Sequence, residues 1–394
     1  MVKKILSVNF LESDYKMKKS KKRVGILFGG KSGEHEVSFC SASSIIEAMD
    51  REKYEVVPIG ITKSGCWLSP GESDLALQTG KIEGKSRIAC KSSSGEKQLI
   101  VISQENNQTE YSFLDKLDVI FPVLHGPYGE DGTVQGLMEL INIPYVGSGV
   151  AASAVAMDKD LMKKIFQQNT LPQTKWMTIK RKRWFLEKEK VLHEINNQFI
   201  YPVFIKPTNL GSSVGISKVQ QSQELEHAIN IATTYDRKII IEEGLERAIE
   251  VECSVLGNDD LSTSIVGEIQ PAGDYYDYNS KYIDKNTKLI VPAGIPDDIA
   301  KEVQRLSKIA YLAIDAAGLS RVDFFVQKNN HTYKVYLNEI NTIPGFTRTS
   351  VYPKLWEKSG IGFSELIDRL IELSLERFKD KMSNKTDYPS AILE

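Results

Sequence analysis

Three oxygen-bearing side chains, those of Asp323, Glu339 and Asn341, lie in otherwise apolar surroundings in the 394-residue sequence. The stretch around them reads RVDFFVQKNNHTYKVYLNEINTIPGFT and predicts two strands joined at an Asn-Asn turn. Since alternate strand residues share a face, Asp323 lies on the same face as Arg321, and Glu339 on the same face as Asn341. We therefore expect two carboxylates and one amide to converge on one side of a hairpin.

Carboxylate and amide oxygens are the hard ligands that Mg²⁺ or Mn²⁺ takes when it shares its coordination shell with water and phosphate. Two buried carboxylates that face each other without a cation would repel, and the pKa of one would rise. A bound metal ion therefore explains this set of side chains better than packing does. The alternatives are that this face of the hairpin is solvated, or that Asp323 only forms a salt bridge with Arg321.

A second group of reactive residues follows the predicted strand YPVFIKP, which ends in Lys206 and Pro207. The next residues, TNLGSSVGIS, include two glycines and the adjacent serines Ser212 and Ser213. Backbone N–H groups and hydroxyls in such a loop can surround phosphate oxygens, and Lys206 adds a positive charge. A lone lysine at the end of a strand is usually a solvated surface charge, but the neighbouring loop favours a phosphate-binding role.

The segment GILFGGKS, residues 25–32, matches the P-loop pattern G-x-x-x-x-G-K-[ST], which would place phosphates at Lys31. A phosphate-binding loop needs irregular backbone between the glycines, whereas Ile26 to Phe28 continue an apolar strand. We therefore interpret the segment as a turn from strand to helix, with Glu34 near the helix start. A carboxylate at that position either caps backbone N–H groups or binds a substrate ammonium, and composition leaves both open.

The elements that must position these residues begin with alternating strands and helices, which predict a small α/β domain over residues 23–148. Within it, the Ser/Gly/Lys-rich stretch from Gly71 to Glu96 indicates a surface insertion or hairpin region. Residues 149–241 change to helix, strand, Gly/Ser-rich loop, strand and helix, and predict a central domain. Residues 242–380 contain the metal-binding hairpin and predict a C-terminal domain. The remaining segments, 1–22 and 381–394, are expected to be a disordered extension and a frayed tail.

Composition excludes several classes of protein. Lys+Arg 50 against Asp+Glu 52 leaves a formal charge of −2, so no global basic field indicates nucleic acid as a partner. No apolar run approaches the roughly 20 residues of a membrane span, and acidic residues interrupt the basic N-terminus, which argues against a secretory signal. Scattered cysteines without C-x-x-C spacing are typical of reduced thiols in a cytoplasmic protein. They are Cys40, Cys66, Cys90 and Cys253.

Seven stretches, in order from about Arg23 to about Lys379, together resemble the D-alanine:D-alanine ligase family of ATP-grasp enzymes. They are GGKSGEHEVS, LHGPYGEDGTVQG, MDKDLMK, FIKPTNLGSSVGISKV, YDYNSKY, SRVDFF and LNEINTIPGFT. The resemblance implies an α/β (α+β) ATP-grasp fold of three domains, a Rossmann-like N-terminal domain followed by two ATP-grasp domains. It also implies ATP between the last two domains, two Mg²⁺ or Mn²⁺ ions, and a cytoplasmic homodimer that serves peptidoglycan synthesis.

The resemblance also implies roles for residues that act on the substrates. Glu34 would bind the ammonium of the first D-alanine, Ser212 would link Glu34 to Tyr282 in the lid, and Lys281 would assist phosphoryl transfer. Arg321 would stabilise the oxyanion of the tetrahedral intermediate. His125 would help to place the first D-alanine, Ser350 would hold the carboxylate of the second, and the apolar Val351 beside it suits a methyl group.

A further set of residues resembles the nucleotide and metal sites of the family. The metal ligands would be Asp323, Glu339 and Asn341. Lys206 would contact the α- and β-phosphates, Glu242 and the backbone of Gly244 and Leu245 would hold adenine, and Glu250 would bind ribose. The complete ATP-binding set is Lys159, Lys206, Ser213, Glu242, Gly244, Leu245 and Glu250.

On this interpretation the protein joins two D-alanine molecules through a D-alanyl phosphate. The alternatives within the family are D-alanine:D-serine and D-alanine:D-lactate ligases, although the lid segment YDYNSKY lacks the histidine that ester-forming relatives often carry. Outside it, a P-loop NTPase and a nucleotide-binding module without catalysis remain as alternatives. An ATP-grasp carboxylase has less support, because the sequence has no biotinyl-lysine segment.

Overall fold

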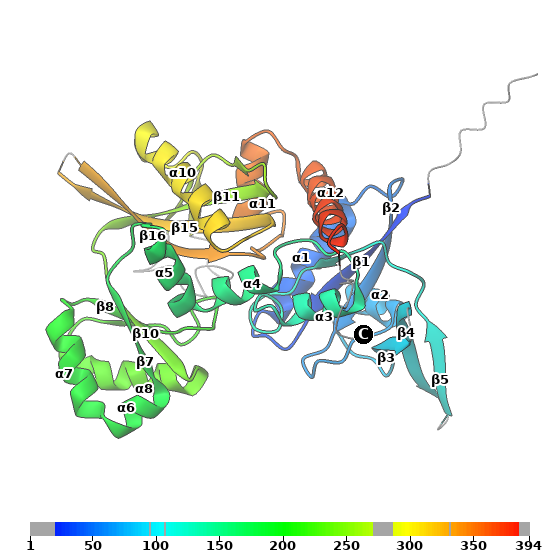
Figure 1. Ribbon diagram of the computed structural model, residues 1–394, viewed down its shortest axis with the longest axis horizontal. Coiled ribbons are helices and arrows are strands. Elements are labelled where there is room, and N and C mark those ends of the chain that lie inside the picture. The colour runs from blue at the N-terminus through cyan, green and yellow to red at the C-terminus, as the bar shows by residue number, and fades with distance from the viewer. Residues whose placement is uncertain (1–19, 94–95, 106–107, 271–286, 331, 386–394) are drawn as a thin grey trace, which may run out of the picture.

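The computed structural model describes residues 20–93, 96–105, 108–270, 287–330 and 332–385. Within these ranges, four sheets and the helices between them form an elongated molecule (Figure 1). The two three-stranded sheets lie toward one end, and the four-stranded and six-stranded sheets lie toward the other. The architecture is therefore mixed α/β, as the sequence predicts.

The first sheet is parallel, with the strand order β2-β1-β6. β1 and β6 are almost continuously buried apolar runs, which is typical of a parallel sheet covered on both faces. Helices connect the strands, and the predicted alternation is confirmed. The elements are β1 (Lys22–Gly29), α1 (His35–Ala48), β2 (Tyr54–Ile61), α2 (Pro70–Thr79), β6 (Val119–Pro122) and α3 (Thr133–Ile141).

The insertion expected from Gly71 to Glu96 is helical in its first part, because α2 occupies it. Ser69 caps this helix by accepting a hydrogen bond from the backbone N–H of Glu72. The later part leads into an antiparallel sheet of β3 (Arg87–Ser93), β4 (Glu96–Glu105) and β5 (Gln108–Phe113). This sheet projects from the edge of the molecule (Figure 1).

The four-stranded sheet has the order β7-β10-β8-β9 with antiparallel pairing throughout. Its strands are β7 (Trp176–Lys180), β8 (Val203–Pro207), β9 (Ser217–Val219) and β10 (Lys238–Glu243). The apolar side chains of α6 (Arg181–Leu186), α7 (Lys188–Gln198) and α8 (Leu225–Tyr235) pack with the sheet in one core. α4 (Val150–Met157) and α5 (Lys159–Gln168) precede the sheet and pack against the six-stranded sheet instead.

The six-stranded sheet follows the order β14-β13-β11-β15-β16, and β12 pairs with β11 beside this path. α10 (Asp297–Ala313) covers its apolar face. Residues 264–266 separate β12 from β13, so the apolar stretch TSIVGEIQ is not one continuous strand. The strands are β11 (Ala248–Gly257), β12 (Ser262–Thr263), β13 (Gly267–Gln270), β14 (Lys288–Ile290), β15 (Gly318–Asn329) and β16 (Thr332–Asn341).

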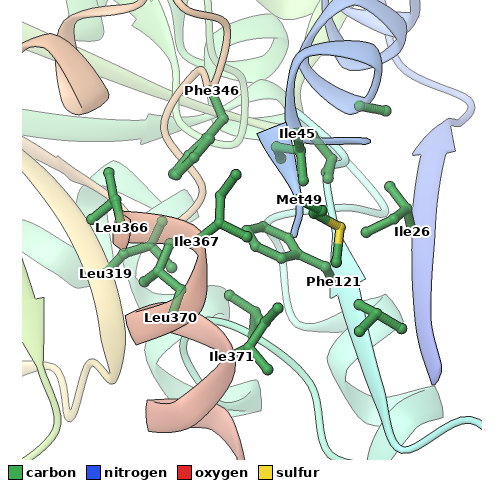
Figure 2. Close-up of a cluster of buried hydrophobic side chains, with 14 of the residues drawn as sticks. Ile26, Ile45, Met49, Phe121, Leu319, Phe346, Leu366, Ile367, Leu370 and Ile371 are labelled. Atoms are coloured by element: carbon green, nitrogen blue, oxygen red, sulfur yellow. The ribbon is translucent and has the colours of Figure 1, made fainter. Parts of the chain in front are cut away.

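The last helices return the chain to the first sheet. α11 (Val351–Lys358) leads to α12 (Phe363–Met382), whose buried residues repeat at helical spacing on one face. Figure 2 shows Leu366, Ile367, Leu370 and Ile371 of this helix facing Phe121 of β6 in one cluster. The C-terminal helix therefore completes the core of the N-terminal sheet.

In the described part of the chain, no helix has both the length and the apolar composition that a membrane span requires. Cys40, Cys66 and Cys253 are free thiols, in agreement with the expectation for these three residues. Burial raises the pKa of the Cys253 thiol to about 11, so this side chain behaves as a small apolar group at neutral pH.

Candidate active site

The β15–β16 hairpin places the acidic residues opposite each other. Asp323 pairs with Glu339 and Arg321 pairs with Asn341, so all four side chains lie on one face, as predicted. The register then shifts at a bulge, because Phe324 pairs with Leu337 and Asn338 has no opposite residue in the ladder.

Positively charged groups already neutralise the two hairpin carboxylates. Nε and Nη2 of Arg321 each donate to an oxygen of Asp323 at 2.7 Å, and Nδ2 of Asn341 donates to Asp323 at 3.1 Å. Nζ of Lys159 lies 3.2 Å from Glu339. The side chains of Asp323 and Glu339 are only 12% and 19% exposed, so the alternative of a solvated face is wrong. The salt bridge from Asp323 to Arg321, which was the other alternative to a metal site, is present.

The donor set fits a magnesium-type ion only as part of a shared coordination shell. Among the described residues, no three His, Cys, Asp or Glu side chains lie together as a metal cluster. Asp323, Glu339 and Asn341 supply two carboxylates and an amide oxygen, which leaves positions for water and phosphate oxygens. This incomplete, oxygen-only set is the type with which Mg²⁺ binds nucleotide phosphates.

A cavity of ≈ 480 Å³ lies between the four-stranded and six-stranded sheets, lined from β8, β9, β10, β11, β15 and β16. Most residues that the resemblance assigns to ATP and metal line it, and Ser212, which the resemblance assigns to the link with Glu34, lines it as well. The ATP and metal residues that line it are Lys159, Lys206, Ser213, Glu242, Leu245, Glu250, Asp323 and Glu339. Gly244 lies beside Pro202, where its N–H donates to the Pro202 carbonyl at 2.9 Å and a Cβ would come within 2.7 Å of that oxygen.

The Gly/Ser-rich loop begins where Pro207 ends β8, and Asp236 anchors its first residues. The Asp236 carboxylate accepts hydrogen bonds from the backbone N–H groups of Thr208 and Asn209 at 3.1 and 3.0 Å. Although burial acts to raise the pKa of Asp236, these and the side-chain hydrogen bonds lower it. Ser212 and Ser213 both have left-handed backbone, with φ of 49° and 59°, a conformation that is uncommon for non-glycine residues.

Lys159 joins three parts of the site. It is the first residue of α5, and Asp158 caps this helix by accepting from the N–H groups of Asp160 and Leu161. Its ammonium donates to the carbonyl of Leu210 in the loop at 3.0 Å as well as pairing with Glu339 of the hairpin.

Glu242 of β10 lies between two lysines at the wall of the cavity. Nζ of Lys163 is 2.9 Å from one carboxylate oxygen, and Nζ of Lys206 pairs with the other. Burial alone would raise the pKa of the Glu242 carboxyl, but the two ammonium groups lower it to about 2. Glu242 is therefore ionised at neutral pH.

Glu34 lies directly before α1, and in the described structure its side chain makes no capping bond to that helix. The capping alternative is therefore wrong. Its carboxylate accepts a hydrogen bond from the hydroxyl of Ser212 instead. Two glycines leave room around it, since a Cβ at Gly126 would lie 3.0 Å, and one at Gly211 3.4 Å, from its Oε2.

His125 and Glu130 lie near Glu34, and sequence reasoning missed Glu130. Nδ1 of His125 is 3.1 Å from the carbonyl oxygen of Ile343, and burial lowers the pKa of His125, so the ring is neutral at pH 7. Glu130 accepts a hydrogen bond from Gly126 N at 2.7 Å. Burial and the Glu34 carboxylate raise the pKa of Glu130 to about 8. The sequence feature that could have identified Glu130 is its place inside the glycine-rich stretch HGPYGEDG.

Two further predicted residues, Ser350 and Val351, do not belong to the described lining of the cavity. Ser350 occupies the N-cap position of α11 and its Oγ accepts from Thr347 N at 3.0 Å, while Val351 begins the helix and is half-buried. Lys281 and Tyr282 lie outside the described residues.

The P-loop interpretation is wrong, because the residues that would have to form the phosphate-binding loop belong to β1. Gly25 to Phe28 are strand residues, and Ile26 to Phe28 are fully buried. Lys31 is exposed, with its ammonium 5.3 Å from the centre of the Tyr128 ring.

Comparison with known families gives two adjacent matches. The family described as D-ala D-ala ligase N-terminus matches residues 23–148, and the family described as D-ala D-ala ligase C-terminus matches residues 165–372. The second match contains both sheets that border the cavity.

Individual relatives agree with these matches. The D-alanine--D-alanine ligases of Natranaerobius thermophilus and Caldicellulosiruptor bescii are each 47% identical, over 93% of this chain and 99% and 98% of their own sequences. The D-alanine-D-alanine ligase structure from Coxiella burnetii has a TM-score of 0.74 and 33% identity, covering 92% of this chain and 96% of its own. VanG D-Ala:D-Ser ligase from Enterococcus faecalis has a TM-score of 0.74 and 37% identity, covering 90% of this chain and 100% of its own. This chain therefore has the ATP-grasp architecture expected from the sequence and belongs to the D-alanine–D-alanine ligase family.

Proposed function

We propose that this protein uses ATP to ligate two D-alanine molecules into D-alanyl-D-alanine through a D-alanyl phosphate. The observation that carries the proposal is that the cavity for the nucleotide and the region around Glu34 are joined in one site. Ser212 lines the large cavity and donates a hydrogen bond to Glu34, so a nucleotide in the cavity and an amino acid beside Glu34 would be neighbours.

The described residues would bind the nucleotide by charge and by loop geometry. Lys159 and Lys206 supply two ammonium groups for phosphate oxygens, and Ser213 lines the same cavity from the Gly/Ser-rich loop. Glu242, Gly244 and Leu245 would hold adenine at the end of β10, and Glu250 would bind ribose. Divalent ions held by Asp323, Glu339 and Asn341 would neutralise phosphate charge.

In the first step, Glu34 would hold the ammonium of the first D-alanine, with neutral His125 close by. The carboxylate of that D-alanine attacks the γ-phosphorus of ATP, a new O–P bond forms, and the bond to ADP breaks. Most of the catalysis in such a transfer comes from positioning and charge neutralisation. The Ser212 hydroxyl serves positioning, because it fixes the carboxylate of Glu34.

In the second step, the amine of the second D-alanine attacks the acyl carbon, and phosphate leaves as the peptide bond forms. Arg321 would donate to the oxyanion, an interaction worth about 3–4 kcal/mol in comparable sites. Ser350 would bind the second carboxylate. Lys281 and Tyr282 would close over the site and exclude water from the acyl phosphate.

We further propose that the protein acts as a cytoplasmic homodimer, and that residues 23–148, 149–241 and 242–380 form its three domains. The activity is tested with ATP, Mg²⁺ and a panel of D-amino and D-hydroxy acids. D-alanyl-D-alanine, ADP and phosphate should form in equal amounts. ATP hydrolysis without dipeptide, or a different main product, would overturn the assignment.

A further inference from the structure

Lys163 is a buried ammonium group that the proposed reaction does not use. Its side chain is only 1% exposed, and it does not belong to the described residues that line the cavity, whereas Glu242 and Lys206 do. Its Nζ lies 2.9 Å from Oε1 of Glu242, and the ammonium of Lys206 pairs with Oε2. The ion pair with Glu242 is therefore the contact through which Lys163 can influence a ligand in the cavity.

Lys163, Glu242 and Lys206 carry two positive charges and one negative charge in a buried cluster. Of these three residues Lys206 and Glu242 line the cavity, so an anion bound there could pair with the Lys206 ammonium. A phosphate group can attract Lys206, but Lys206 then loses its pairing with Glu242. If Lys163 were absent, Glu242 would then be a buried carboxylate without a cation, and the instability of that state would oppose the movement of Lys206.

We propose that Lys163 is a positioning residue, the permanent partner of Glu242 that releases Lys206 for nucleotide phosphates. The inference rests on the proposed binding of ATP in this cavity. When phosphates draw Lys206 toward them, Glu242 keeps one cation and stays ionised. Lys163 itself touches no ligand.

The variant Lys163→Met tests the inference through nucleotide affinity. In the nucleotide-free protein Lys206 still pairs with Glu242, so the variant should fold. ADP with Mg²⁺ should bind about 10- to 100-fold more weakly than to the wild type, because Lys206 cannot serve Glu242 and phosphate together. Adenosine has no phosphate and does not recruit Lys206, so its affinity should stay within about 2-fold. Equal weakening of both ligands would instead show that Lys163 only supports the shape of β10, and would overturn the proposal.

Two further comparisons make the result specific. In a Glu242→Gln background, Lys163→Met should cause no further loss of ADP affinity, because the neutral amide needs no cation. This comparison also replaces the single variant if that variant does not fold, and an added 10-fold loss would overturn the proposal. Lys164→Met, one residue along α5 and paired with Asp160 at 2.9 Å, is the matched control and should bind ADP as the wild type does. If the wild type itself binds no ADP, the proposed function fails rather than this inference.

Discussion

The hydroxyl of Ser212 donates a hydrogen bond to the carboxylate of Glu34, although 178 residues separate the two in the sequence. Ser212 belongs to the loop after β8, and Glu34 lies directly before α1 of the N-terminal sheet. Both residues are buried. The contact therefore joins the phosphate-binding loop to the part of the chain proposed to hold the first D-alanine.

Removal of this contact by Ser212→Ala should raise the KM for the first D-alanine about 10-fold or more. A hydrogen bond to a charged group contributes roughly 1.5–3 kcal/mol, and without it the Glu34 carboxylate loses its fixed orientation. Steady-state kinetics with D-alanine as the varied substrate measure the effect. Ser44→Ala is the control, because the Ser44 hydroxyl donates to the Cys40 carbonyl of its own helix at 3.0 Å. A change confined to the KM for ATP would contradict the assigned role.

Lys206→Ala should lower kcat/KM for ATP by about 10²-fold, because it removes a buried cation from the nucleotide cavity. The protein should still fold, since Lys163 remains paired with Glu242. Lys31→Ala should change the same parameter less than about 3-fold, because Lys31 is exposed and its ammonium lies over the Tyr128 ring rather than at the nucleotide cavity. The opposite ranking would restore the P-loop interpretation.

Glu339→Gln keeps the size of the side chain and removes its charge, so it should raise the Mg²⁺ concentration needed for half-maximal activity about 10-fold or more. A titration of activity against Mg²⁺ at saturating ATP gives this concentration. Glu365→Gln, at an exposed pair with Arg369 on α12, should leave it unchanged. Identical titrations of wild type and Glu339→Gln would remove Glu339 from the metal site.

The raised pKa of Glu130 predicts how stability depends on pH. Its folded-state pKa of about 8 exceeds the ordinary value of 4.5. The stability that the bound proton contributes is therefore fully present below pH 4.5, and it is lost as the pH rises from 4.5 through 8. Between these values the wild type should lose stability relative to Glu130→Gln, which has no proton to release. The neighbouring Glu34, His125 and Arg321 are present in both proteins.

Urea unfolding at pH 5, 7 and 9 measures the difference in the free energy of unfolding between the two proteins. The free energy of unfolding of the wild type, relative to that of Glu130→Gln, should be highest at pH 5 and lowest at pH 9. Parallel pH profiles would show that Glu130 ionises as an ordinary exposed carboxyl.

The second substrate should be D-alanine. Val351 is apolar and begins α11 directly after Ser350, which suits a methyl group beside the bound carboxylate. D-serine adds only a hydroxyl, which an apolar pocket rejects by roughly 10²-fold, so some D-serine product is expected. Competition of equal D-alanine and D-lactate at pH 6 and pH 8 provides the measurement. A depsipeptide that predominates at either pH would contradict the specificity but leave the ligase chemistry intact.

Local patterns in the sequence are enough to predict the strands and the chemistry that they carry. Alternation along β15 and β16 correctly places Asp323, Glu339 and Asn341 on one face, because side-chain direction in a strand depends only on the period of two. The continuous apolar run of β1 correctly indicates a buried strand and argues against the P-loop. Pro207 and the following glycines and serines correctly locate a loop beside Lys206.

Contacts between distant segments required the tertiary structure. The packing of α12 on β6 and the pairing of Lys163 with Glu242 join residues far apart in the chain, and no sequence pattern predicted them. The bond from Ser212 to Glu34 was expected only from the resemblance to the family, not from periodicity. Periodicity shows that a face is apolar or that a lysine lies on a helix, but not which partner it meets. The pKa of Glu130 likewise depends on burial and on Glu34, and both arise only when the chain has folded.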